Sequence, residues 1–293
     1  MSLSRSIARL WACGLPIAAL GISSCTRAPG EGRSAPPVAG PIMGPAGRIH
    51  VRDEGSGGLP VVFLHSYAGN ADHWSNQIDH LKSTRRVIAI DLRGHGQSDP
   101  PASGHYDVDS LAADVSAAVD ALHLQRFVLV GHSMGGSAAI AYAAAHPEHV
   151  AGLVLVGTPG RTPHEQAEQI MTSMRSNFDQ VSKGYWDKLL ESARPEVQEK
   201  IRSQIASVPR DASLEIIEEL FDFDPLPPLM SYRGPKLLID TPHGESPGAL
   251  HNIAHGVRRK IIEGTSHWPQ LDKPDEFNAI LDQFLGMVPP PTT

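Results

Sequence analysis

The feature of this chain that most restricts its fold is a series of short apolar runs separated by helical segments. The runs are continuous rather than alternating, which is typical of parallel strands buried on both faces of a sheet. We expect strands at 61–64, 86–90, 127–130, 152–156, 236–239 and 260–262. Strand, helix and strand in repeated order predict an α/β fold, with a mostly parallel central sheet and helices on both of its faces.

Residues 160–234 interrupt this order. The segment is charged and amphipathic and contains no convincing strand, and we expect helices at 166–178, 185–192, 196–206 and 214–221. We interpret it as a helical cap, at about residues 160–235, inserted after the strand at 152–156. The folded domain that carries this cap is expected to span residues 49–293.

The first 24 residues have the layout of an export signal. Arg5 and Arg9 precede an apolar run at 10–22, which is shorter than the roughly 20 residues that a membrane-spanning helix needs. Small residues follow and end at Cys25 in a pattern that resembles a bacterial lipobox. We expect a secreted or periplasmic protein that is anchored to a bacterial membrane surface through a lipid on Cys25. The alternative is an ordinary signal peptide with a chance cysteine.

A proline- and glycine-rich stretch separates this signal from the domain. Residues 29–47 hold five Pro and five Gly without hydrophobic periodicity, so we predict a flexible tether over 25–48. The signal carries two arginines and no acidic residue, so its removal would change the net charge from −7 to −9. This acidic balance argues against a nucleic-acid partner.

The strongest chemical signal is the G-x-S-x-G motif that Gly131, Ser133 and Gly135 form between a predicted strand and an alanine-rich helix. A serine held in a sharp, strained turn exposes its hydroxyl, and flanking glycines let the neighbouring backbone pack closely. The helix N-terminus also brings amide groups and a positive dipole end near a developing oxyanion. We therefore expect Ser133 to be a nucleophile.

With this motif in place, the chain resembles the α/β-hydrolase family over about residues 49–286. The other matching stretches are 64–69, 91–98 and 264–267, and they follow the family's order. Within the family the chain looks like the single-cap serine esterases. The resemblance implies a Ser-His-acid triad, a small-molecule ester substrate and no cofactor.

A serine hydroxyl needs a base, and the order of the triad in this fold is serine, acid, histidine. His267, which follows the strand at 260–262, is therefore the expected base. Two acids follow the strand at 236–239: Asp240 at its end and Glu245 in the next loop. We assign the acid to Glu245, because the family's acid comes a few residues beyond the strand. Asp240 remains the alternative and is expected to bond within its own turn.

The oxyanion hole needs two backbone donors. The amide of Met134, directly after the nucleophile, is the first. Resemblance to the family's His-Gly-x stretch makes Tyr67 the second, with Ser66 in place of the usual glycine. Because the donor is a backbone group, the Tyr67 side chain can line the pocket. His132 is expected to pack or hydrogen-bond locally, and Arg93 to brace its loop.

These residues predict a serine hydrolase that cleaves carboxylic esters through an acyl-enzyme. The same fold acting on carbon–carbon, thioester or amide bonds, or as a cofactor-free perhydrolase, remains open, and so does a non-catalytic ligand-binding protein. The chain has 15 histidines, but it lacks an H-E-x-x-H motif and a Cys/His cluster, so we predict no metal site. The sequence leaves the acyl and alcohol specificity and the oligomeric state open.

Overall fold

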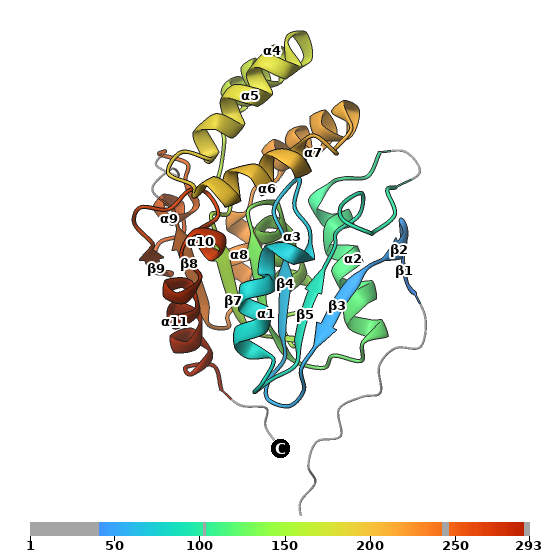
Figure 1. Cartoon of the computed structure of the whole chain (residues 1–293), viewed down its shortest axis with the longest axis vertical. Helices are drawn as coiled ribbons and strands as arrows, with labels where there is room; N and C mark the ends of the chain where they lie inside the picture. Colours follow the sequence, from blue (N-terminus) through green and yellow to red (C-terminus); the bar gives the residue numbers. More distant parts are fainter. Residues whose placement is uncertain (1–40, 102–103, 242–245, 290–293) are drawn as a thin grey trace, which may run out of the picture. The chain divides into compact units, whose positions relative to one another are not determined.

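The computed structural model describes residues 41–101, 104–241 and 246–289 (Figure 1). The predicted export signal, Cys25 and most of the predicted tether lie outside the described residues, as does Glu245. None of the helices among the described residues combines the length and the apolar character needed to cross a bilayer.

A seven-stranded sheet forms the centre of the molecule, in the order β3-β5-β4-β6-β7-β8-β9. Every neighbouring pair is parallel except β3 with β5. The strands are β3 (Val51–Glu54), β4 (Val61–Leu64), β5 (Val87–Ile90), β6 (Phe127–His132), β7 (Val150–Val156), β8 (Lys236–Asp240) and β9 (Arg258–Ile261). β4, β5, β6 and β7 are buried along their whole length, which explains their unbroken apolar sequence. The predicted α/β fold with a mostly parallel sheet is confirmed.

The structure differs from the sequence-based expectation at the first edge of the sheet. β3 is an antiparallel edge strand whose polar residues hide it from a search for apolar runs. Before it, β1 (Ile42–Gly44) and β2 (Gly47–Ile49) form an antiparallel hairpin. The predicted tether over 25–48 is therefore wrong for its last residues. Ile42 and Ile49 are buried there, but as isolated apolar residues among glycines and prolines they show no periodicity.

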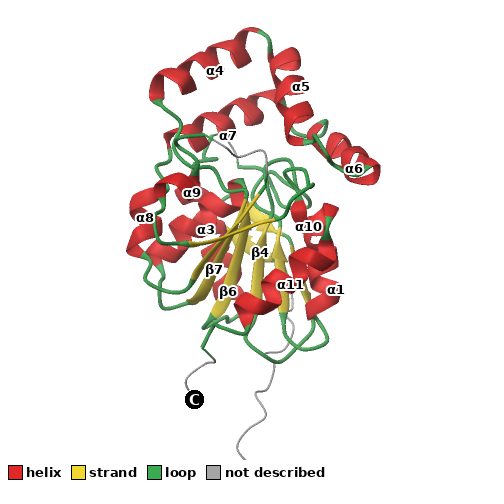
Figure 2. Cartoon of the chain, turned by 90° about the vertical axis from the view of Figure 1, so that its left-hand side faces the viewer, coloured by secondary structure: helices red, strands yellow, loops and turns green. Residues whose placement is uncertain are grey.

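Helices cover both faces of the sheet (Figure 2). On one face α2 (Val108–Ala121) and α3 (Met134–Ala145) pack together, and on the other α1 (Ser75–Leu81) lies against α11 (Pro274–Leu285). Short helical turns complete the carboxyl-end loops: η1 (Ala71–Trp74), α9 (Leu250–Ile253) and α10 (Pro269–Asp272). Two separate apolar cores result, one on each side of the sheet.

Five helices lie between β7 and β8, and four of them form a cap above the carboxyl ends of the strands (Figures 1 and 2). The four are α4 (His164–Ser176), α5 (Phe178–Leu189), α6 (Pro195–Ile205) and α7 (Arg210–Asp222). The fifth, α8 (Leu226–Ser231), packs against α3 and was not expected from the sequence. Its two prolines obscure a helical pattern, yet proline is tolerated in the first turn of a helix.

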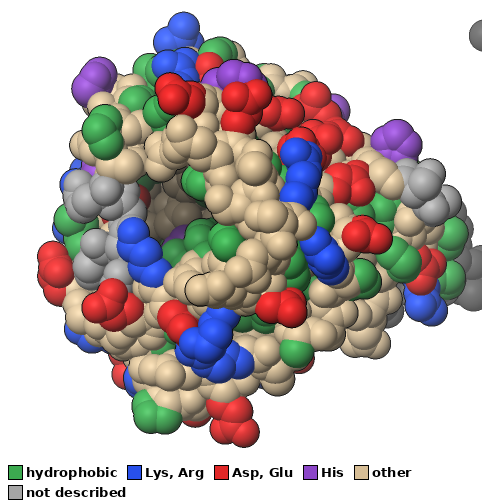
Figure 3. All heavy atoms as spheres, turned by 90° about the horizontal axis from the view of Figure 1, so that it is seen from above, with side chains coloured by type: hydrophobic (Ala, Val, Ile, Leu, Met, Phe, Trp, Pro, Cys, Tyr) green, Lys and Arg blue, Asp and Glu red, His purple; other side chains and the backbone are tan. Residues whose placement is uncertain are grey.

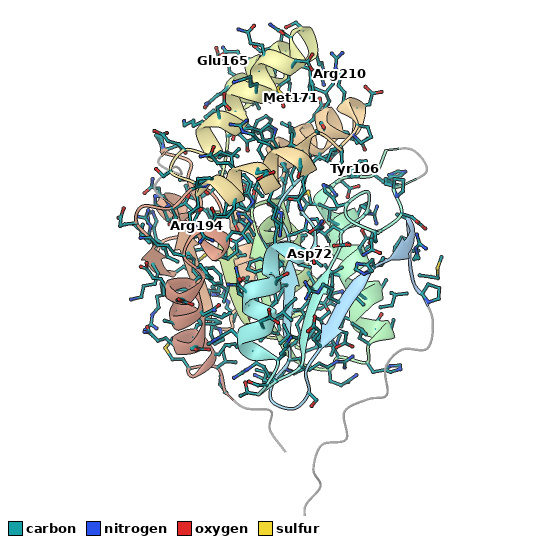
Figure 4. The ribbon with its side chains drawn as sticks, viewed as in Figure 1. Asp72, Tyr106, Glu165, Met171, Arg194 and Arg210 are labelled. Carbon is teal, nitrogen blue, oxygen red and sulfur yellow. The ribbon has the colours of Figure 1, made fainter. Side chains whose placement is uncertain are left out.

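Hydrogen bonds tie the cap to the core at its outer edge. The Arg194 backbone amide donates to Asp272 Oδ1 at 3.1 Å, and its guanidinium donates to the Leu271 carbonyl at 2.7 Å. On α6, Lys200 Nζ donates to the carbonyl of Asp72 at 3.0 Å. Figure 4 shows Arg194 at this junction and Asp72 on the core below it. The cap is thus attached to the α/β core at the start of α6 and again along this helix.

A buried ion pair braces the loop after β5. Arg93 Nε and Nη2 donate to the two carboxylate oxygens of Asp114, each at 2.8 Å, and Arg93 Nη1 donates to the His105 carbonyl at 2.8 Å. Both members of the pair are almost fully buried. The pair joins the loop to α2 beneath the carboxyl end of the sheet, so Arg93 holds structure and does not face the cavities described below.

Candidate active site

Ser133 lies between the end of β6 and the start of α3, in a backbone conformation that L-residues seldom adopt. Its φ is 52° and its ψ is −117°. The Ser133 amide donates to the Val156 carbonyl at 2.9 Å, and its own carbonyl accepts from the Gly136 amide at 2.8 Å. Hydrogen bonds to β7 and to α3 therefore hold the serine in the sharp strand-to-helix turn that the sequence motif predicts.

A close backbone contact brings the two expected oxyanion donors to the same place. A Cβ on Gly135 would lie 2.5 Å from the carbonyl oxygen of His65, so only glycine allows α3 to start this close to the end of β4. This contact sets Met134, at the start of α3, beside the loop that carries Tyr67. Within the described part of the chain, neither amide donates a hydrogen bond to another protein group, so both can serve an oxyanion.

His65 fixes the loop that carries Tyr67. Its Nδ1 donates to the Ser66 carbonyl at 2.7 Å, because a carbonyl only accepts, and its Nε2 accepts from the Leu92 amide at 2.9 Å. These contacts select one neutral tautomer, and burial lowers the pKa of His65 to about 4. This role of His65 was not expected from the sequence. Its position directly after β4 was the only signal.

His267 lies in the loop after β9. Hydrogen bonds to α5 of the cap and to α10 of the core hold that loop. The His267 amide donates to the Leu189 carbonyl at the end of α5 at 3.0 Å. The hydroxyl and the amide of Ser266 both donate to Asp272 Oδ2, at 2.5 and 2.8 Å. Ser133 and His267 line one cavity of about 290 Å³. The nucleophile and base expected from the sequence thus face the same space.

His132 supports the loop that carries His267, and hydrogen bonds engage both of its ring nitrogens. Its Nε2 donates to the His267 carbonyl at 2.8 Å, which leaves Nδ1 to accept from Gln270 Nε2 at 3.1 Å. Burial is the largest cause that moves the pKa of His132 well below its usual value, and the neighbouring His267 adds to it. A neutral His132 with both nitrogens engaged is a positioning residue for the loop that carries His267.

The structure describes one of the two candidate acids, Asp240, but not the other, Glu245. Asp240, at the end of β8, accepts from Arg259 Nε at 2.5 Å, and its Oδ2 lies 3.1 Å from His251 Nδ1. Among the described residues, no hydrogen bond joins Asp240 to His267. Glu245, the preferred acid, lies outside the described residues, so its assignment stays a prediction.

A second cavity, of about 230 Å³, opens from Ser133 into the cap. Its apolar lining includes Ile170, Met174, Val181, Ile217, Leu220 and Phe221. Seen from the cap side, the molecule is visibly hollowed, with hydrophobic side chains inside the hollow (Figure 3). Trp186 does not line this space. It is buried between Tyr67 and Trp268, with ring centroids 5.4 and 6.1 Å away.

The side chain of Tyr67 connects the loop after β4 to the cap. It lines the apolar cavity, as expected, and its hydroxyl donates to Ser213 Oγ on α7 at 2.6 Å. Burial raises the pKa of Tyr67 and favours the neutral phenol as a donor. The residue whose amide is an expected oxyanion donor therefore also makes a side-chain hydrogen bond to the cap.

Comparisons with known proteins agree with this fold. Residues 60–193 match the family described as alpha/beta hydrolase fold. A putative 2-succinyl-6-hydroxy-2,4-cyclohexadiene-1-carboxylate synthase from Bacillus subtilis (strain 168) is 30% identical over 263 residues, which cover 82% of this chain and 96% of that protein. A non-heme chloroperoxidase from Streptomyces lividans is 52% identical over 101 residues, but the match spans only 36% of that protein and 34% of this chain.

Solved structures show the same relationship. The structure of Est816, described as an N-acyl homoserine lactone degrading enzyme, superimposes with a TM-score of 0.71 at 27% sequence identity, covering 81% of this chain and 96% of that one. The long match to the Bacillus protein, the family match and the shared fold lead to one conclusion. The chain belongs to the α/β-hydrolase fold family of hydrolases.

Proposed function

We propose that this protein is a serine hydrolase that cleaves carboxylic esters through an acyl-enzyme. One observation carries the proposal: Ser133, held in a strained turn, borders both the polar cavity that contains His267 and the apolar cavity in the cap. A nucleophile, a base and an apolar chamber meeting at one hydroxyl suit acyl transfer from an apolar acyl group.

The reaction would proceed in two halves. Ser133 Oγ attacks the ester carbonyl carbon while His267 accepts the hydroxyl proton, and the amides of Met134 and Tyr67 hold the oxyanion. The tetrahedral intermediate collapses, the carbon–oxygen bond to the alcohol breaks, and His267 returns the proton to the departing alcohol. His267 then takes a proton from water, whose oxygen attacks the acyl carbon. The bond from the acyl carbon to Ser133 Oγ breaks, His267 returns the proton to Ser133 Oγ, and the carboxylic acid leaves.

The two cavities suggest how a substrate would lie. The apolar cavity under the cap suits the acyl chain, whereas the polar cavity around His267 suits the leaving alcohol and the incoming water. The Est816 relative supports an ester-type substrate, because a lactone is a cyclic ester. We also propose that the enzyme acts outside the cytoplasm, at a membrane surface to which Cys25 anchors it.

Replacing the nucleophile tests the proposal directly. Ser133→Ala is expected to lower kcat on p-nitrophenyl esters by about 10⁴-fold or more, because the alanine cannot form an acyl-enzyme. The variant should also lose covalent labelling by a fluorophosphonate. Ser207→Ala, which removes an exposed cap serine, is the control and should keep both properties.

Full turnover or labelling in Ser133→Ala would refute the mechanism. A panel of thioesters and amides separates the ester preference from the mechanism. If these are cleaved faster than esters by the same Ser133-dependent route, the nucleophile stands and the proposed substrate class is wrong. Ligand binding without turnover on the whole panel would support a non-catalytic protein.

A glycine beside the base offers a second test. Gly157 has a φ of +48°, and a Cβ there would lie 2.9 Å from His267 Cε1, so Gly157→Ala should displace the imidazole. We expect kcat to fall by about 10²-fold, the cost of a displacement of about 1 Å in an active site. The control is Gly184→Ala on α5. A Cβ at this position has no neighbouring atom of the described residues within 4 Å, so kcat should not change. Equal kcat in both variants would show that His267 is not the base.

The choice of acid is tested with paired amide variants. Glu245→Gln is expected to reduce kcat by about 10⁴-fold if Glu245 fixes the tautomer of His267. Asp240→Asn should instead keep kcat and lower the free energy of unfolding by about 1–3 kcal/mol, because it weakens the buried contacts to Arg259 and His251. Steady-state kinetics and urea denaturation separate the two effects. A folded Asp240→Asn protein that loses turnover, beside an active Glu245→Gln protein, would reverse the assignment.

The apolar cavity predicts a shift in acyl specificity. Ile217→Trp should fill part of the cavity and lower kcat/KM for octanoyl esters by about tenfold or more, while acetyl esters, which do not reach this depth, keep theirs. The measurement is kcat/KM over p-nitrophenyl esters of graded acyl length. A uniform decrease for all chain lengths would mean that the acyl group does not occupy this cavity.

A further inference from the structure

The turn between α3 and β7 gathers three side chains that can ligate a metal ion: His146, Glu148 and His149. Their ligand atoms lie within 4.8 Å of one another. Glu148 Oε1 is 4.0 Å from His146 Nδ1 and 3.9 Å from His149 Nε2. The three side chains are 40%, 64% and 28% exposed, so an ion from solvent can reach them.

In each histidine, the ring nitrogen that is not the one near Glu148 lies within hydrogen-bond distance of a hydroxyl group. His146 Nε2 lies 3.2 Å from Ser116 Oγ on α2, and His149 Nδ1 lies 2.9 Å from the hydroxyl oxygen of Tyr142 on α3. If these nitrogens carry the proton and donate to the hydroxyl oxygens, the nitrogens facing Glu148 are left unprotonated. A hydrogen bond from the ring nitrogen that does not bind the metal is the usual way in which proteins orient a metal-binding histidine.

The backbone makes this turn rigid. The His146 amide donates to the Tyr142 carbonyl at 2.8 Å, and the His149 amide donates to the His146 carbonyl at 3.1 Å. The His149 carbonyl accepts from the Phe127 amide at 2.9 Å, which fixes the turn to the first residue of β6. His146 is also the C-cap of α3, where the negative end of the helix dipole favours a cation.

We propose that His146, Glu148 and His149 bind one divalent transition-metal ion of the Zn²⁺ class. Two imidazole nitrogens and one carboxylate oxygen match the ligand preference of Zn²⁺ and leave a fourth position for water. Metal–ligand distances of about 2.0–2.1 Å place tetrahedral ligand atoms about 3.3 Å apart. Glu148 therefore has to move by less than about 1 Å, and the two imidazole nitrogens, which lie within 4.8 Å of each other, have to approach by up to about 1.5 Å. Ca²⁺ and Mg²⁺, which prefer oxygen ligands, should not compete.

The site lies far from the proposed reaction centre. It is at the C-terminal end of α3, whereas Ser133 precedes the N-terminal end, and twelve helical residues separate the ends by about 18 Å. The ion would therefore stabilise the junction of α2, α3 and β7 without touching the substrate. The inference does not depend on the proposed esterase activity.

Isothermal titration of tag-free, chelator-stripped protein with ZnCl₂ tests the site. We expect one ion per chain and a Kd below about 10 µM. His146→Gln and His149→Gln should each weaken binding by about tenfold or more, and the exposed substitution Glu148→Gln should also weaken it without perturbing the fold. His164→Gln is the control. His164 pairs with Glu168 across 3.4 Å on α4, as an ordinary surface His–Glu pair, and the affinity should not change.

Two further measurements decide the outcome. A saturating excess of Zn²⁺ should raise Tm by several degrees in the wild type and in His164→Gln, but not in Glu148→Gln. Co²⁺ in place of Zn²⁺ should give the visible absorption of a four-coordinate ion only where His146 and His149 are both present. A Kd above about 100 µM in the wild type, or folded Glu148→Gln and His149→Gln proteins that bind Zn²⁺ as tightly as the wild type, would overturn the proposal.

Discussion

The close packing of the first turn of α3 against the ends of β4 and β7 is the constraint on which the rest of this molecule depends. A serine with a positive φ costs on the order of 1–3 kcal/mol and persists only where its surroundings hold it. Here the Ser133 amide is bonded to β7, while glycine at 135 lets α3 start against the His65 carbonyl. The central position of β6, buried between β4 and β7, makes this restraint possible.

The cap is hydrogen-bonded to both sides of the same centre. Ser213 on α7 accepts from the Tyr67 hydroxyl, and the Leu189 carbonyl at the end of α5 accepts from the His267 amide. The first contact reaches the loop of the expected oxyanion donor and the second reaches the loop of the expected base. A movement of the cap would therefore shift both loops, and the cap helps to order the site that it covers.

The strands that could be predicted most directly are those in which all consecutive residues are buried, because such strands have an unbroken apolar sequence. β4, β5, β6 and β7 are buried on both faces, and their apolar runs showed it. The strand β3 was missed because three of its four residues are charged, which an edge strand permits. The helix α8 was missed because its two prolines interrupt the expected pattern.

The same distinction applies to the site. Ser133 and His267 were expected because a motif and the order of the chain point to them, and both line one cavity. The supporting roles of His65 and His132 were not found, because their partners, the Leu92 amide and the His267 carbonyl, are distant from them in sequence. Neither contact leaves a periodic or local signal. Hydrogen-bond partners that determine a protonation state are visible only when the fold is known.

The two ends of α3 show how one helix can serve two opposite kinds of charge. At its N-terminus, free amides and the positive end of the dipole face the position where an oxyanion would form next to Ser133. At its C-terminus, the negative end faces His146 and the proposed cation. The helix dipole thus favours an anion at one end and a cation at the other. Because α3 is buried against the sheet along most of its length, both ends are held in fixed positions.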